Sequence, residues 1–185
     1  MVYNLTMKLL ILLISVLSCQ KEFNVLKNVR FFEANFKQVV KTGDYVYRDF
    51  EGHLWFSKGK VKINITSPDT EFVLIDDSTV KTLNFKDSTL VIQKKLKDVD
   101  FFFNMMLNPT KILPSDGDCV AVFAPDSGNV DSMKVFFRGK IIKKVIIYQD
   151  EIVVVTEIRA FKTLAGIPDT VFTLPRVAGF QIIRF

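Results

Sequence analysis

The sequence contains little of what catalytic and metal-binding sites require. Its 185 residues include one histidine, His53, and two cysteines, Cys19 and Cys119. No His, Cys or carboxylate cluster has metal-ligand spacing, and neither a Gly-x-Ser-x-Gly turn nor a glycine-rich phosphate-binding loop occurs. We therefore expect no enzyme activity, no cofactor and no metal, and we interpret His53 as a surface residue of a strand.

Charge and aromatic content further narrow the functional class of the protein. The formal net charge is +5, but Lys and Arg are scattered among acids and no run of five basic residues appears, so nucleic-acid binding is not expected. Two cysteines do not make a disulfide scaffold. Phenylalanine is in excess, with eighteen Phe against four Tyr and one Trp. That excess indicates a wide apolar interior or an apolar ligand.

The N-terminal region has the pattern of an export signal. Lys8 precedes an apolar stretch over residues 9–17, which is too short to span a bilayer but has the length of a signal-peptide core. A buried core helix is the competing interpretation, although such a helix rarely lacks a polar face. We expect a signal peptide over residues 1–18 and one mature domain over 19–185.

The end of this signal, Val16-Leu17-Ser18-Cys19-Gln20, resembles a lipobox, in which the cysteine is diacylated and becomes the mature N-terminus. Lipidation of Cys19 would leave Cys119 as a lone buried thiol. Ordinary signal peptidase could cut the same bond, and a Cys19–Cys119 disulfide would then be open to the chain.

Period-two alternation dominates the mature region and predicts ten or eleven mostly antiparallel strands. The clearest is Lys60–Thr66, in which Val61, Ile63 and Ile65 alternate with polar residues. A short helix is expected over residues 22–28. Residues 31–38 fit strand alternation better than a continuing helix. So many strands with short links predict an α+β, mostly antiparallel fold: one highly curved sheet forming an unclosed β-barrel covered by short helices.

Residues 98–107 break the alternation. Asp98 is a plausible N-cap, Pro109 stops the segment, and the residues between are apolar on almost every side. Met suits surfaces that must fit varied apolar partners. The segment is therefore either a plain buried helix or a movable lid, and residues 110–113 are expected to add another helical turn.

Three motifs in order resemble the LolA family of periplasmic carriers of outer-membrane lipoproteins. They are Phe32-Glu33-Ala34-Asn35-Phe36-Lys37-Gln38, then Gly52-His53-Leu54-Trp55-Phe56-Ser57-Lys58-Gly59-Lys60-Val61-Lys62-Ile63, then Ser67-Pro68-Asp69. Ile75-Asp76-Asp77 stands where the family has an Asp-Gly turn, and Phe172-Thr173-Leu174-Pro175 is similar to its closing segment.

The resemblance implies an incomplete barrel whose apolar cavity shields the acyl chains of lipoproteins during transfer from the inner to the outer membrane. The expected cavity lining consists of Phe32, Phe36, Leu54, Phe56, Val61, Ile63, Ile65, Phe72 and Leu74. Phe102, Met105 and Met106 would come from the lid. Lys58 stands at the position of the family's Arg latch, and Lys lacks the planar fork of Arg.

The implied partners are acylated lipoproteins, an inner-membrane lipoprotein-releasing transporter and an outer-membrane acceptor, and the protein is expected to be a periplasmic monomer. One alternative is a LolB-like acceptor tethered to the membrane through Cys19. A second is a structural or protein-binding envelope lipoprotein with a filled barrel.

Overall fold

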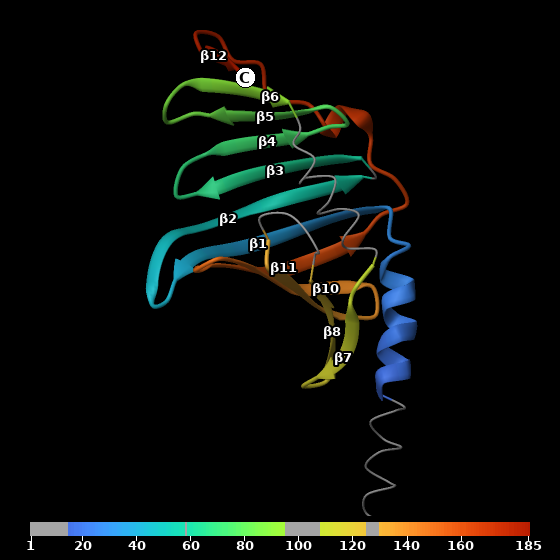
Figure 1. Ribbon diagram of the computed structural model, residues 1–185. Coiled ribbons are helices and arrows are strands. Elements are labelled where there is room, and N and C mark those ends of the chain that lie inside the picture. The colour runs from blue at the N-terminus through green and yellow to red at the C-terminus, as the bar shows by residue number, and fades with distance from the viewer. Residues whose placement is uncertain (1–14, 58, 95–107, 125–129) are drawn as a thin grey trace, which may run out of the picture.

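The computed structural model describes residues 15–57, 59–94, 108–124 and 130–185, and it contains one open, strongly curved sheet (Figure 1). The spatial order of the twelve strands is β12-β6-β5-β4-β3-β2-β1-β11-β10-β9-β8-β7. Their bounds are β1 Phe31–Thr42, β2 Tyr45–Ser57, β3 Lys60–Ser67, β4 Glu71–Ile75, β5 Thr79–Asn84, β6 Thr89–Lys94, β7 Lys111–Ser115, β8 Asp118–Phe123, β9 Ser132–Arg138, β10 Ile141–Gln149, β11 Ile152–Thr163 and β12 Gln181–Arg184.

This architecture confirms the predicted fold class, with one local correction. All neighbouring strands pair in antiparallel fashion except β12, which runs parallel to β6. Residues 45–57 form one long continuous strand, because β1 pairs along their whole length. Lys111–Ser115 is a strand and not a helical turn. A short 3-10 helix, η1, lies at Asp169–Val171.

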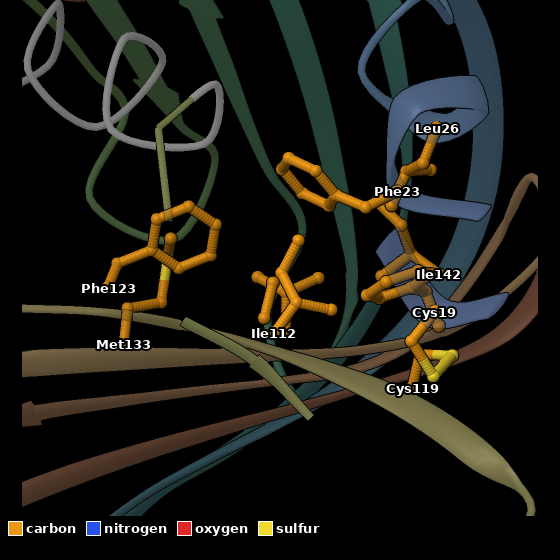
Figure 2. Close-up of a cluster of buried hydrophobic side chains, with 11 residues drawn as sticks. Cys19, Phe23, Leu26, Ile112, Cys119, Phe123, Met133 and Ile142 are labelled. Carbon is orange, nitrogen blue, oxygen red and sulfur yellow. A yellow bond between two sulfur atoms is a disulfide. The ribbon is translucent and has the colours of Figure 1, made fainter. Parts of the chain in front are cut away.

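The main hydrophobic core lies between one helix and one half of the sheet. The helix over residues 15–26 places Phe23 and Leu26 against β7–β10, as Figure 2 shows. The Phe23 ring contacts those of Phe123 and Phe137 at centroid distances of 6.4 and 5.8 Å. Phe123 and Phe137 are 1% and 0% exposed, so this half of the inner face is filled by protein side chains.

A disulfide fastens the same helix to β8. Cys19 and Cys119 are bonded, with Cα atoms 5.4 Å apart, and both are buried. The Glu22 carboxylate adds a polar contact by accepting a hydrogen bond of 2.6 Å from the Gly139 amide. The sulfur of Cys19 cannot form a disulfide and an acyl-bearing thioether at once, so the structure adopts the unlipidated alternative for this residue.

The C-terminal segment, residues 164–185, covers part of the outer face. It leaves β11 at one end of the sheet and reaches β12 at the far edge (Figure 1). Asp169 pairs with Lys60 of β3 at 2.8 Å, and the Phe180 ring contacts Phe85 at 5.4 Å. Because these contacts lie at opposite ends of the strands, the segment crosses the outer face of β3–β6. There Leu83 is 1% exposed.

The β4–β5 turn is held by one carboxylate. Asp76 accepts hydrogen bonds from the backbone amides of Ser78 and Thr79, the Thr79 hydroxyl and the Lys81 ammonium, at 2.7–3.1 Å. Burial opposes ionisation of Asp76, but these four donors outweigh it and hold the pKa of the carboxyl well below its ordinary value.

Reduction of the disulfide should destabilise the protein. Cys19 and Cys119 are 100 residues apart in sequence, and closing a loop of that length removes much unfolded-state entropy. We expect reductant to lower the free energy of unfolding by roughly 2–5 kcal/mol, measured by urea titration. The doubly substituted Cys19→Ala/Cys119→Ala protein should not respond to reductant. An unchanged urea midpoint for reduced wild type would contradict a structural role for the bond.

Substitution Asp76→Asn should weaken the protein at neutral pH more than in acid. A carboxyl whose folded-state pKa is depressed contributes stability above its unfolded-state pKa of about 4, and that contribution is lost as pH falls toward the folded-state value. We expect a loss of about 1–2 kcal/mol at pH 7 that shrinks below about pH 4, measured by urea unfolding at several pH values. Equal losses of stability at pH 7 and in acid would contradict the assignment.

Candidate functional site

The candidate site is the inner face of β1–β4, beside the filled half of the sheet. Strand register decides which side chains belong to it. Ala34 lies opposite Leu54, Leu54 opposite Ile63, and Ile63 opposite Val73. Directly opposite residues of antiparallel strands point to the same face. These four side chains therefore form one apolar row that crosses four strands.

Phenylalanine rings line one end of this face. Phe32 stacks between Phe56 and Phe161, with ring centroids 4.8 Å away on each side. The three residues come from β1, β2 and β11, which are adjacent in the sheet. The Phe36 ring meets Phe50 edge-on at 6.1 Å farther along. Much of the phenylalanine excess is thus concentrated on the inner surface.

Gly52 allows β2 to approach both β3 and the Phe36 ring closely. It lies directly opposite Phe36 in β2, where a Cβ would be 2.9 Å from the tip of the Phe36 ring and would also strike the Asn64 carbonyl oxygen. The register between β2 and β3 shifts at this point, between Glu51 and Gly52. The missing side chain therefore allows close approach of two neighbouring strands and of one aromatic ring.

Polar groups on the inner face are paired with one another. Thr156 donates its hydroxyl hydrogen to Gln38 Oε1 at 3.0 Å. Arg48 pairs with Glu71 at 3.2 Å, and its guanidinium lies 4.9 Å from the centre of the Phe50 ring. The apolar surface formed by the row from Ala34 to Val73 and by the phenylalanine rings ends at this ion pair. We call this surface the apolar strip. The middle of the face offers broad, non-directional contacts, which suit flexible hydrocarbon better than a rigid polar ligand.

Seven of the nine expected cavity residues share this face. They are Phe32, Phe36, Leu54, Phe56, Val61, Ile63 and Ile65. Phe36, Val61 and Ile65 are buried, whereas Leu54, Phe56 and Ile63 are half-buried. The lid residues Phe102, Met105 and Met106, and the latch position Lys58, lie outside the described residues.

The assignment of Phe72 and Leu74 to the cavity was wrong. Leu74 lies opposite Lys62, and Phe72 opposite Asn64, so both point to the outer face. The Lys62 ammonium lies 5.7 Å from the Phe72 ring, and Phe72 also contacts Phe85 beneath the C-terminal segment. The β4 residues on the inner face are Val73 and Ile75.

Sequence reasoning did not place Val73 and Ile75 on the inner face, because β4 has no alternation of apolar and polar residues. Residues 72–75 are all apolar, since the outer side is covered by the C-terminal segment and the inner side faces the site. Phe161 was missed for a related reason. The pairing of β1 with β11 shifts register beside Arg159, which interrupts the period of two just before Phe161.

His53 lies on the outer face, away from the apolar strip. Its Nδ1 is 2.5 Å from Asn35 Oδ1, and its ring packs on Trp55 with centroids 4.1 Å apart. Burial lowers the pKa of His53, while the nearby Glu33 carboxylate opposes that effect. Within the described ranges, no group of three or more His, Cys, Asp and Glu residues could hold a metal ion.

One family model matches the part of the chain that forms most of this site. Residues 27–101, which include β1–β6, match the model of the family described as outer membrane lipoprotein carrier protein LolA. This part of the chain is LolA-like. Members of the family are periplasmic binding or carrier proteins without enzymatic activity. No curated protein matches the chain significantly.

Three solved structures are similar to this chain. An uncharacterized conserved protein from Thermus thermophilus aligns with a TM-score of 0.59 at 9% identity, over 91% of this chain and 99% of that one. A LolA superfamily protein from Nitrosomonas europaea aligns with a TM-score of 0.46 at 12% identity, over 84% and 97%. The Pseudomonas aeruginosa MucA/MucB complex structure gives 0.44 at 11% identity, over 85% and 61%.

No helix in the described ranges combines the length and hydropathy needed to span a membrane.

The substitution Gly52→Ala should destabilise the LolA-like sheet. The added methyl group would strike the Asn64 backbone and the Phe36 ring, neither of which can move without shifting a strand. Overpacking of this kind costs roughly 1–3 kcal/mol, which thermal or urea unfolding would detect. Gly166→Ala is the matched control, because a methyl group added there would have no neighbouring atom within 4 Å. Equal stability of the two variants would contradict the close approach at Gly52.

Proposed function

We propose that this LolA-like protein is a periplasmic carrier that shields the acyl chains of lipoproteins during their transfer from the inner to the outer membrane. The observation that carries the proposal is the half-buried apolar strip on the inner face of β1–β4, beside a helix that fills the other half. Hydrocarbon chains cannot cross water unaided, because each exposed methylene costs about 0.8 kcal/mol. The strip offers a temporary apolar surface in which no bond is made or broken.

Release is as important as capture for a carrier. Contacts along the strip are aromatic and aliphatic, so they add affinity in proportion to buried area and impose no single geometry on the cargo. We propose that residues 1–18 are removed on export, that the domain over 19–185 is a monomer, and that Phe102, Met105 and Met106 form a lid latched by Lys58. Its partners would be acylated lipoproteins, an inner-membrane lipoprotein-releasing transporter and an outer-membrane acceptor.

The disulfide supports a diffusing carrier over a tethered acceptor. A LolB-like acceptor anchored through Cys19 needs the sulfur that is bonded to Cys119. The filled-barrel alternative, a structural envelope protein, is less well supported, because Leu54, Phe56 and Ile63 remain half-buried whereas the side chains beneath the helix are almost fully buried.

Two adjacent residues of β4 give a matched test. Val73 points to the inner face and Phe72 to the outer face. We expect Val73→Asp to weaken binding of a fluorescent fatty-acyl probe by at least about tenfold, because hydrocarbon would have to cover a carboxylate. Phe72→Asp should keep near wild-type binding per folded molecule, with folding checked by thermal unfolding.

The same proteins should be purified from native periplasm and membranes and weighed intact by mass spectrometry. Wild type and Phe72→Asp should carry lipoprotein or lipid, and Val73→Asp should not. Normal cargo on Val73→Asp would overturn the assignment of the cavity. An acyl group on Cys19 in the membrane fraction would instead support the tethered acceptor.

A further inference from the structure

The outer face of β7–β11 and β1 carries a second surface, on the opposite side of the sheet from the filled core. Register places six lysines on it: Lys37, Lys41, Lys111, Lys134, Lys144 and Lys162. We call this surface the basic outer face. The C-terminal segment contacts the other half of the outer side, through Lys60 of β3 and Phe85 at the end of β5.

Apolar side chains alternate with these lysines across the strands. One cross-strand row runs Lys111, Val122, Lys134, Ile146, Val155 and Val39. The Lys134 ammonium lies 5.2 Å from the Tyr148 ring centre, and that of Lys144 lies 4.5 Å from the Phe136 ring centre. The lysine stems thus lie on apolar surface while their charges remain at its edge.

Positive charge on this face is mostly uncompensated. Lys37 pairs with Asp49 and Glu51, at 3.1 and 3.7 Å, and Lys162 pairs with Glu33 at 3.5 Å. The other four lysines form no ion pair with any described residue. Two further acids lie on this face. Glu157 lies between Lys144 and Lys37 in register, and Asp118 pairs with Arg138 and Lys143.

A shallow depression of about 260 Å³ lies in this face. Val39 and Val155 are among its lining residues, and Lys37, Lys41 and Glu157 complete the lining. Lysine presents a compact point charge that suits phosphate. Valine beside it suits the glycerol and first methylene groups of a lipid. Lysine and valine together therefore complement the headgroup region of a phospholipid.

We propose that the basic outer face docks the protein on an anionic phospholipid bilayer. The charge of the face complements that of the membrane, and its apolar residues favour the headgroup boundary over an acidic protein, whose recognition would require fixed polar partners. Docking is distinct from cargo binding, because this half of the sheet turns its inner face away from the bilayer. It holds the carrier near the membrane without inserting it.

Vesicle sedimentation of the full oxidised protein, free of cargo, tests the proposal. The probes are phosphatidylcholine vesicles with and without about one third phosphatidylglycerol, in low and high salt. We expect binding to the anionic vesicles alone and its loss at high salt, because exposed charges are screened. Equal binding to neutral vesicles, or no binding to anionic vesicles at low salt, would overturn the proposal.

A triple substitution locates the contact. Each lysine near an anionic surface contributes roughly a fivefold factor in partitioning, so Lys41→Gln/Lys134→Gln/Lys144→Gln should bind about a hundredfold more weakly. The control, Lys21→Gln/Lys27→Gln/Lys94→Gln, removes the same charge from exposed positions elsewhere. Equal loss in the control would mean that net charge acts rather than this face, and would overturn the assignment. Acyl-probe binding should stay intact in the first variant, so that docking and carrying can fail separately.

Discussion

A twelve-stranded open sheet has two faces to cover, and the described chain has two main segments with which to cover them. The helix over 15–26 covers the inner face of β7–β10, and the segment over 164–185 crosses the outer face of β3–β6. The two segments therefore cover opposite halves of the sheet on opposite faces. The inner face of β1–β4 and the outer face of β7–β11 are among the regions that these segments leave. Both proposals follow from what each of those regions presents: hydrocarbon on one, and lysine with valine on the other.

This arrangement of the two covering segments also explains for which residues the sequence could predict the face of the sheet. Alternation is clean in β3, whose outer side carries polar residues, and register places Val61, Ile63 and Ile65 together on one face, as that alternation predicted. Where both sides are covered, alternation disappears. Residues 72–75 of β4 are apolar throughout, so their faces follow from pairing with β3 and not from pattern. Local sequence predicted the strands and turns well, but register between strands decided the site.

Long-range pairing was the other limit of sequence reasoning. A helix near Phe23 was expected and the Cys19–Cys119 disulfide was one of two alternatives, but nothing in the local pattern predicts that this helix packs on β7–β10. The hydrogen bond that Glu22 accepts from the Gly139 amide is equally hidden from local pattern, since it depends on where the helix packs. The resemblance to LolA did not help here, because the matched region ends at residue 101, before β7 begins. The packing of the helix on this half of the sheet is a long-range contact that local pattern does not encode.

The state of Cys19 bears on how the protein would meet a membrane. A covalent diacyl anchor would hold it there through many buried methylenes, and a carrier that must cross the periplasm would then have to be released by cleavage. A sulfur committed to Cys119 removes that anchor and leaves the charge of the basic outer face. Attraction through a few lysines is weak, screened by salt and reversible. That is the kind of membrane contact that a carrier can make at one bilayer, break, and make again at the next.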